Sequence, residues 1–246
     1  MNIREKENEL FKDYVVTDET KTQKDIVPDG VIDEASFLKA EKKILFLLKE
    51  VNGGDGWDLR NFVNKNCRED DNDNKPRIQT WDNVYRWTRA ILESNSICWK
   101  DVENVEREQH REEILKKIAV MNVKKTSGGS SADGTELKKA TKANKEVLRK
   151  QIELYDADYI VCGYTHEYFD MLDYLTEEDK KTKGYVYFPE AVGDRKDLYS
   201  SYFIKKDKKQ AIVYVYHPQS YINHQDLFDV LLKTVKEIEE KLENVK

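Results

Sequence analysis

Four short apolar runs, separated by segments of helical periodicity, constrain the fold of this chain most strongly. The runs are residues 44–48 (ILFLL), 118–121 (IAVM), 159–163 (YIVCG) and 211–216 (AIVYVY). Runs of this length and composition are typical of strands buried on both faces. A short helix is expected over residues 35–43, and helices of amphipathic spacing are expected over residues 81–94, 136–155 and 226–245. Strands that alternate with helices predict an α/β fold, here a three-layer α/β/α sandwich around a central, mostly parallel four-stranded sheet.

The chain is long enough, at 246 residues, to bury a core of its own. Residues 1–34 are polar and irregular, with a turn signal at residues 28–30 (Pro-Asp-Gly), and are interpreted as an N-terminal arm. Residues 35–246 are then expected to form a single domain. Within them, the lysine-rich segment 176–210 contains a possible hairpin formed by residues 185–188 and 202–204.

Composition excludes several classes of protein. No stretch approaches the roughly 18 apolar residues of a membrane helix, and the N-terminus lacks an apolar signal core, so a soluble, cytoplasmic protein is expected. Cys67, Cys98 and Cys162 form no CxxC pair and match no zinc or iron–sulfur spacing, so neither a zinc site nor an iron–sulfur cluster is expected from the cysteines. A net charge of -6 argues against tight bulk binding of nucleic acid, but it leaves room for a local basic groove.

Polar residues follow each of the four apolar runs. They occupy residues 49–54 (KEVNGG), 122–131 (NVKKTSGGSS), 163–166 (GYTH) and 217–220 (HPQS). Ligands of parallel sheets bind at the carboxyl ends of the strands, where the loops converge. Carboxylate, amide, lysine and imidazole groups are therefore expected to share one rim of the sheet.

These segments, in this order, resemble the motifs of the uracil-DNA glycosylase superfamily, and the iron–sulfur type most closely. Residues 49–53 (KEVNG) and 60–63 (RNFV) resemble its first motif, and residues 122–125 (NVKK) resemble the end of its second strand. Residues 148–163 resemble a later helix and strand that ends in glycine, and residues 217–220 (HPQS) resemble its His-Pro-Ser motif. The resemblance covers about residues 42–240, and it implies the fold of that superfamily.

The resemblance also implies a DNA glycosylase that hydrolyses the N-glycosidic bond of a flipped uracil or other damaged or modified base. Glu50 would position or activate the attacking water and stabilise the oxocarbenium cation. His217 would donate a hydrogen bond to the leaving base. Phe62 would stack on the base, and Asn122, with Asn52, would bind its polar edge.

Further residues at the same rim are candidates for contacts with the DNA backbone. They are Lys124, Lys125, Ser127, Gln219 and Ser220. A basic stripe could also follow the phosphates, formed by Lys138, Lys139, Lys142, Lys145, Arg149 and Lys150. The expected partner is thus DNA, bound weakly or at a lesion by a monomer, without a metal, a cofactor or a membrane.

Departures from the motifs keep other interpretations open. The cysteine ligands of the iron–sulfur cluster are absent, Val51 replaces an acidic or amide residue, Asn52 replaces a proline, and Gln219 interrupts the His-Pro-Ser motif. The main alternative is a catalytically degenerate member that binds nucleic acid or protein, and a third is a hydrolase of small nucleosides. Each site residue also has an ordinary structural interpretation, such as a salt-bridged Glu50 or a core Phe62.

Overall fold

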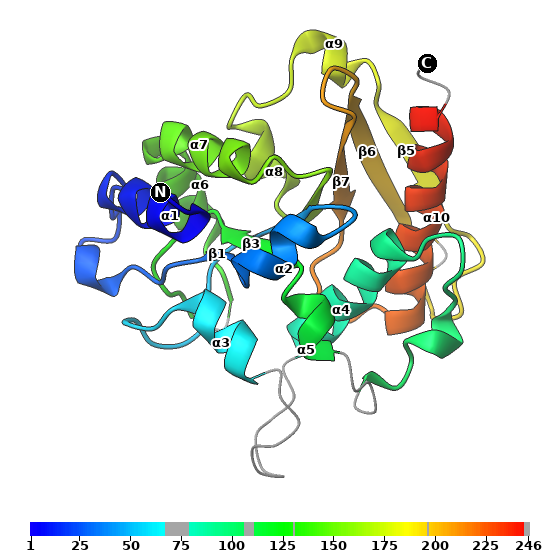
Figure 1. The fold of residues 1–246 in the computed structure, drawn as a ribbon, viewed down its shortest axis with the longest axis horizontal. Helices are drawn as coiled ribbons and strands as arrows, with labels where there is room; N and C mark the ends of the chain where they lie inside the picture. Colours follow the sequence, from blue (N-terminus) through cyan, green and yellow to red (C-terminus); the bar gives the residue numbers. More distant parts are fainter. Residues whose placement is uncertain (67–78, 106–110, 130, 196, 244–246) are drawn as a thin grey trace.

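A computed structural model of the chain describes residues 1–66, 79–105, 111–129, 131–195 and 197–243 (Figure 1). Within this part, one sheet of seven strands has the order β1-β3-β2-β4-β7-β6-β5. The strands are β1 (Gly30–Val31), β2 (Ile44–Leu48), β3 (Ile118–Asn122), β4 (Tyr159–Gly163), β5 (Gly184–Tyr187), β6 (Tyr199–Lys205) and β7 (Gln210–Val215). The α/β class expected from the sequence is therefore confirmed.

The four strands predicted from the apolar runs lie side by side and run parallel at the centre of the sheet. Strand β2 pairs with β3 on one side and with β4 on the other, and β4 pairs with β7. The predicted four-stranded sheet is nevertheless too small, because β1, β6 and β5 extend it with antiparallel pairs. Strand β1 has only two residues, so it leaves no apolar run to detect.

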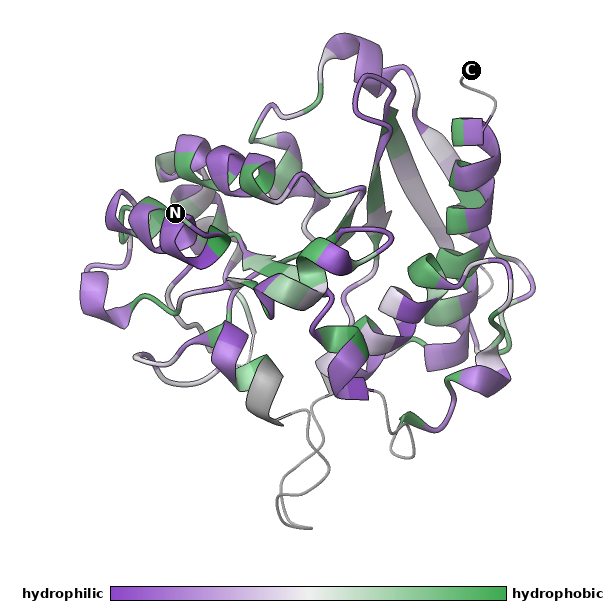
Figure 2. Ribbon diagram, in the orientation of Figure 1, coloured by the Kyte–Doolittle hydropathy of each residue, from purple (hydrophilic) through white to green (hydrophobic). Residues whose placement is uncertain are grey.

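The helices cover both faces of the sheet (Figure 1). They are α1 (Ile3–Lys12), α2 (Glu34–Lys39), α3 (Leu59–Asn66), α4 (Gln79–Leu92), α5 (Arg111–Leu115), α6 (Gly134–Ala143), α7 (Lys145–Tyr155), α8 (His166–Asp170), α9 (Glu177–Lys180) and α10 (His224–Glu243), with the short 3-10 helices η1 (Gln23–Asp25) and η2 (Trp99–Asp101). In Figure 2 the central strands are hydrophobic, whereas the helices carry both kinds of residue.

Side-chain alternation divides the core into two layers. Ile44, Phe46 and Leu48 of β2 pack with α3, α4, α5 and α10, while Leu45 and Leu47 pack on the opposite face with α2, α6, α7 and α8. Successive residues of a strand point to opposite faces, so an unbroken apolar run supplies both layers. No helix in the described ranges is long and apolar enough to cross a membrane.

The helix predicted over residues 136–155 is divided into α6 and α7 at Asn144. The Asn144 side chain accepts a hydrogen bond from the Val15 N–H at 2.6 Å and donates to the Val15 carbonyl at 2.9 Å. The break between the two helices thus holds the segment around Val15, which is distant in sequence. The helical periodicity of residues 136–155 did not reveal this break.

Residues 1–34 are part of the domain rather than a separate arm. Strand β1 pairs with β3, and α1 packs against α7. Glu7 of α1 accepts hydrogen bonds from Arg60 Nη1 at 2.6 Å and from the Val31 N–H at 2.8 Å, and both charged side chains are buried. Buried charges are stable only when they are paired, so the N-terminal segment completes the fold around Arg60.

The hairpin predicted in the lysine-rich segment is confirmed. Strands β5 and β6 are antiparallel, and Tyr187 lies opposite Tyr199. Val186 and Tyr202 are buried on the side covered by α10, whereas Tyr185 and Tyr187 alternate outward on the other side. The hairpin forms one edge of the sheet, beside α10 in Figure 1.

Candidate functional site

A cavity of about 600 Å³ opens at the carboxyl ends of the parallel strands. Six residues singled out in the sequence line it, namely Glu50, Asn52, Phe62, Asn122, His217 and Gln219. Residues from the end of β2, the end of β3 and the segment after β7 thus meet in one place, as the topology of a parallel sheet predicts. We refer to this cavity as the strand-end cavity.

Glu50 follows β2 and is held from two sides. Lys124 Nζ donates a hydrogen bond to Glu50 Oε2 at 2.5 Å, and the two side chains are only 7% and 6% exposed. The carboxylate also lies against Gly128, because a Cβ built there would be 1.9 Å from Glu50 Oε1. The Gly128 N–H donates to the Val51 carbonyl at 2.9 Å, which fixes the two loops to each other. Glycine at position 128 therefore makes room for this carboxylate.

His217 is held at the rim in a defined tautomer. The Gln219 N–H donates a hydrogen bond to His217 Nδ1 at 3.1 Å, so the proton of the neutral ring lies on Nε2. Burial, together with the positive charge of Lys49, lowers the pKa of His217 from 6.5 to about 4. The imidazole is consequently neutral at physiological pH and can act as a hydrogen-bond donor through Nε2.

The turn after His217 is anchored by contacts to neighbouring elements. Asn83 of α4 donates through Nδ2 to the Pro218 carbonyl at 2.6 Å, and the Ser220 N–H donates to the His217 carbonyl at 2.9 Å. Gly163 at the end of β4 allows Pro218 and Leu48 to approach, since a Cβ there would be 3.2 Å from Pro218 Cδ and 2.9 Å from Leu48 Cδ2. These contacts fix His217 beside the end of β2.

Asn122 is positioned through its backbone by a buried acidic group. Its N–H donates to Asp29 Oδ2 at 2.7 Å. Asp29 also accepts hydrogen bonds from Lys125 Nζ at 2.7 and 2.9 Å and from Gln151 Nε2 at 2.9 Å. The Asn122 side chain lines the strand-end cavity, and in the described part of the chain no hydrogen bond to its amide is found. An amide with both a donor and an acceptor thus remains for a ligand.

Aromatic side chains form the apolar wall of the cavity. Phe62 of α3 lies 5.3 Å from Trp57, ring centroid to ring centroid, with the planes inclined at 59°. Trp57 and Trp81 of α4 also line the cavity, as do Leu48, Val51, Leu59 and Thr80. The sequence motifs did not single out Trp57 or Trp81, although Trp57 lies between residues 49–53 and 60–63, the two parts of the first motif. Such a wall suits a flat, partly apolar ligand.

The residues expected to contact phosphates are mostly engaged within the protein. Lys125 is buried in the ion pair with Asp29, so its predicted DNA contact is wrong. Lys124 is paired with Glu50, and Ser127 Oγ is bonded to Asp55 at 2.6 Å. The Ser220 hydroxyl is buried and has no partner in the described ranges. Of the residues proposed for the DNA backbone at this rim, Gln219 alone is exposed.

The described residues contain no group of three or more His, Cys, Asp or Glu side chains that could hold a metal ion. Cys98 is exposed, and Cys162 is buried, where burial raises the pKa of its thiol well above the usual value. Cys67 and His110 lie outside the described residues. The polar side chains that line the strand-end cavity include the Glu50 carboxylate, the Thr80 hydroxyl, the His217 imidazole and three amides.

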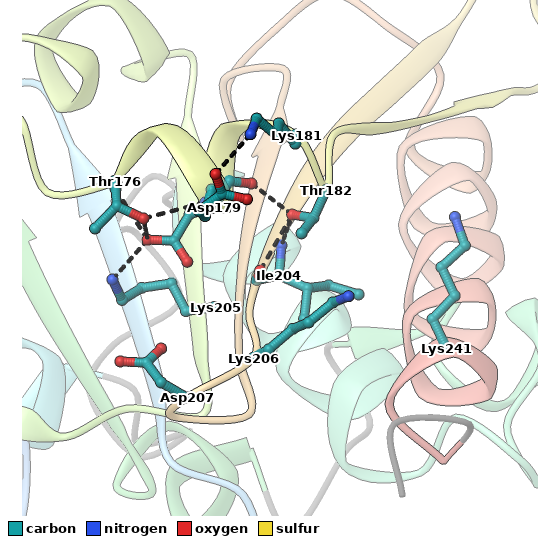
Figure 3. Close-up of a pocket in the computed structure, with 10 residues that line it drawn as sticks. Thr176, Asp179, Lys181, Thr182, Ile204, Lys205, Lys206, Asp207 and Lys241 are labelled. Carbon is teal, nitrogen blue, oxygen red and sulfur yellow. Dashed lines mark hydrogen bonds and ion pairs between the residues drawn. The ribbon is translucent and has the colours of Figure 1, made fainter.

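A second cavity, of about 650 Å³, lies at the opposite end of the sheet (Figure 3). Asp179 of α9 accepts hydrogen bonds there from Lys205 Nζ at 2.9 Å and from Thr176 Oγ1 at 2.8 Å. In Figure 3 the Asp179 carboxylate lies between these two partners. Since these groups satisfy one another, they stabilise the contact between α9 and β6, and the strand-end cavity is the better candidate for chemistry.

Comparisons of the chain with family models, with curated proteins and with solved structures gave no match. The function of the strand-end cavity must therefore be inferred from its own geometry.

Proposed function

We propose that the chain is a DNA glycosylase that hydrolyses the N-glycosidic bond of an extruded uracil or other modified base. The observation that carries the proposal is the convergence of Glu50, Phe62, Asn122 and His217 on one cavity at the carboxyl ends of the parallel strands. These are the residues to which the resemblance with the uracil-DNA glycosylase superfamily assigns the chemistry. The parallel core and the two helical layers also agree with the sandwich expected for that superfamily.

In the proposed reaction, the bond between the sugar C1′ and the base nitrogen breaks, and its electron pair leaves with the base. The sugar carbon develops oxocarbenium character, which the Glu50 carboxylate stabilises electrostatically. A water oxygen then forms a bond to C1′, and one of its protons passes through the carboxylate to the departing base. The clamp formed by Lys124 and Gly128 holds the carboxylate in one position for this task.

Recognition of the base divides between the remaining groups. The amide of Asn122 offers one donor and one acceptor to the polar edge of the base, and Phe62 offers a ring face. His217 donates through Nε2 to a base oxygen as negative charge accumulates there. A neutral imidazole suits this role because it donates a hydrogen bond without transferring its proton.

The main alternative is a binding protein that keeps the cavity but lacks catalysis. The observation that favours it is the burial of Glu50 in an ion pair with Lys124, which is also a common structural arrangement. Val51, which lines the same cavity, adds no second polar group for activating water.

A base-release assay separates the two functions. The protein is incubated with labelled oligonucleotides that carry uracil, other deaminated bases or alkylated bases, and abasic sites are cleaved with alkali. The proposal predicts cleavage at one class of lesion, abolished by Glu50→Gln and retained by Glu41→Gln, which alters an exposed glutamate before β2. Absence of cleavage at every lesion, from folded protein, would favour the binding role, and cleavage of free nucleosides alone would favour a small-molecule hydrolase.

A further inference from the structure

Five tyrosines form an aromatic surface next to the strand-end cavity, which we call the tyrosine surface. It consists of Tyr164, Tyr185, Tyr187, Tyr199 and Tyr216. Four of them are well exposed, at 52% for Tyr164, 48% for Tyr185, 64% for Tyr187 and 43% for Tyr199. Large aromatic side chains usually bury most of their surface, so a group of exposed rings indicates a binding surface.

Four of the rings form a continuous series across β5, β6 and the residue that follows β7, and Tyr164 lines the same groove. Tyr187 of β5 lies directly opposite Tyr199 of β6, with ring centroids 5.8 Å apart. Tyr185 lies 6.5 Å from Tyr187 and Tyr199 lies 6.5 Å from Tyr216. Because Tyr185 and Tyr187 alternate with the buried Val186, the hairpin directs both rings to the face that α10 does not cover.

Tyr164 occupies an unusual backbone conformation. Its φ is 58°, in the left-handed region that bulky residues rarely adopt. The Tyr164 N–H donates to the Val215 carbonyl at 2.9 Å, which holds this turn in place after β4. The fold thus maintains an exposed aromatic ring at a backbone position that carries strain, and such positions are concentrated at functional sites.

Cationic side chains lie over the rings of this surface. Lys49 Nζ is 4.6 Å from the centre of the Tyr164 ring, and Lys183 Nζ is 5.0 Å from that of Tyr185. The Arg195 guanidinium is 5.2 Å from the Tyr216 ring, and it is also hydrogen-bonded to Asp197 at 3.2 Å. Rings interleaved with cations provide both stacking faces and charges that complement phosphates.

The tyrosine surface leads to the strand-end cavity. Tyr216 immediately precedes His217, and Lys49 immediately precedes Glu50. A groove of about 260 Å³ is lined by Tyr164, Tyr185, Tyr199 and Tyr216. Lys183 and Asp170 also line it, and the Asp170 carboxylate accepts a hydrogen bond from the Tyr214 hydroxyl at 2.5 Å. A chain bound along this groove would therefore pass beside the cavity in which Glu50 and His217 lie.

We propose that the tyrosine surface binds a single-stranded segment of nucleic acid, whose bases stack on the exposed rings while Lys49 and Lys183 contact its phosphates. The choice of a single strand follows from the chemistry of the surface, because bases in a duplex cover one another and offer no free faces to the rings. Binding of a single strand does not depend on the proposed glycosylase function. Only the further step, in which a base of the bound strand enters the strand-end cavity, rests on that function.

Binding to a fluorescein-labelled single-stranded oligothymidine, measured by fluorescence anisotropy, tests the inference. Tyr187→Ala and Tyr199→Ala are each expected to weaken binding about 5- to 150-fold, the range measured when one stacking aromatic is removed. Tyr187→Phe is expected to bind as the unaltered protein does, because it keeps the ring. Leu38→Ala, at an equally exposed residue of α2, serves as the matched control and is expected to change nothing.

Salt dependence and a duplex competitor sharpen the test. With three cations at the surface, the slope of log K against log salt is expected to be no steeper than about −2. Equal or tighter binding of the duplex, or unchanged binding by both alanine variants, would overturn the inference. If base release occurs and is insensitive to these variants, the tyrosine surface has no role in substrate binding, but the glycosylase proposal is unaffected. If binding depends on the tyrosines and no base is released, the result supports the single-strand binding surface and not the glycosylase activity.

Discussion

Gly128→Ala tests whether the position of the Glu50 carboxylate matters. A Cβ at residue 128 would lie 1.9 Å from Glu50 Oε1, whereas a carbon and an oxygen in contact stay about 3.3 Å apart, so the carboxylate must retreat by about 1.4 Å. The backbone of Gly128 does not have a positive φ, and the obstructing atoms are at the end of a side chain, so the fold should accommodate alanine. The movement would break the 2.5 Å hydrogen bond to Lys124.

A displacement of about 1 Å in a catalytic group can lower a rate about 100-fold, so base release by Gly128→Ala is expected to fall at least about 100-fold. The assay is the single-turnover rate of base release, with the thermal midpoint of unfolding measured in parallel. Gly129→Ala is the matched control, because no atom lies within 4 Å of a Cβ built there. Full activity of Gly128→Ala would refute a role for this carboxylate position.

A second variant keeps the test valid if Gly128→Ala is unstable. In a Glu50→Ala background the obstructing carboxylate is absent, so adding Gly128→Ala should not lower the thermal midpoint further. If Gly128→Ala lowers the thermal midpoint of the Glu50→Ala protein as much as it lowers that of the unaltered protein, the clash with Glu50 is not the cause, and the proposed fit between these two residues is incorrect.

Three further predictions concern stability and pH. Asp29→Asn leaves the buried Lys125 ammonium without its carboxylate, and urea denaturation should show a loss of about 3 to 5 kcal/mol, while a loss below about 1 kcal/mol would contradict the buried ion pair. Deletion of residues 1–33 removes β1 and leaves Arg60 without Glu7, so circular dichroism should show an unfolded chain. A cooperative thermal transition of this variant would instead support the interpretation of the N-terminal segment as a separate arm. His217 has its pKa lowered to about 4 in the folded state, so the unfolded state binds more protons between that value and 6.5. Stability should therefore fall as pH decreases from about 6.5 to about 4, less so in His217→Gln, and base release should persist well below pH 6.5; equal pH dependence in both proteins would contradict the shift.

The central strands could be predicted because the local run of apolar residues matches the environment of these strands, which are covered by helices on both faces. Residues 44–48 and 159–163 coincide with β2 and β4, since apolar residues at every position satisfy both faces of a covered strand. Once those strands were placed, the carboxyl-end rule brought Glu50, Asn122 and His217 to one rim, and the structure shows them lining one cavity. The carboxyl-end rule, together with the resemblance to the uracil-DNA glycosylase motifs, thus supplied most of the site prediction.

What the sequence did not reveal depends on partners distant in the chain. Lysine is a residue type that commonly contacts phosphates, which is why Lys125 was predicted to do so. Its burial depends on an ion pair with Asp29, nearly a hundred residues earlier in the chain. The break at Asn144 depends on Val15, and the place of the N-terminal segment depends on the pair formed by Glu7 and Arg60. Trp81 reaches the cavity only because α4 packs against the sheet. None of these contacts leaves a periodic pattern that a reading of one segment can detect.

Detection of the free base itself tests whether the strand-end cavity catalyses hydrolysis of the glycosidic bond. Mass spectrometry of the low-molecular-weight fraction, after incubation with an oligonucleotide that carries uracil and with matched oligonucleotides carrying other lesions, reports the product without a later cleavage step. We expect release of one base by the unaltered protein, loss of that release in Glu50→Gln and in His217→Ala, and unchanged folding of both variants by circular dichroism. Release that continues in both variants would contradict the assignment of the strand-end cavity as the catalytic site.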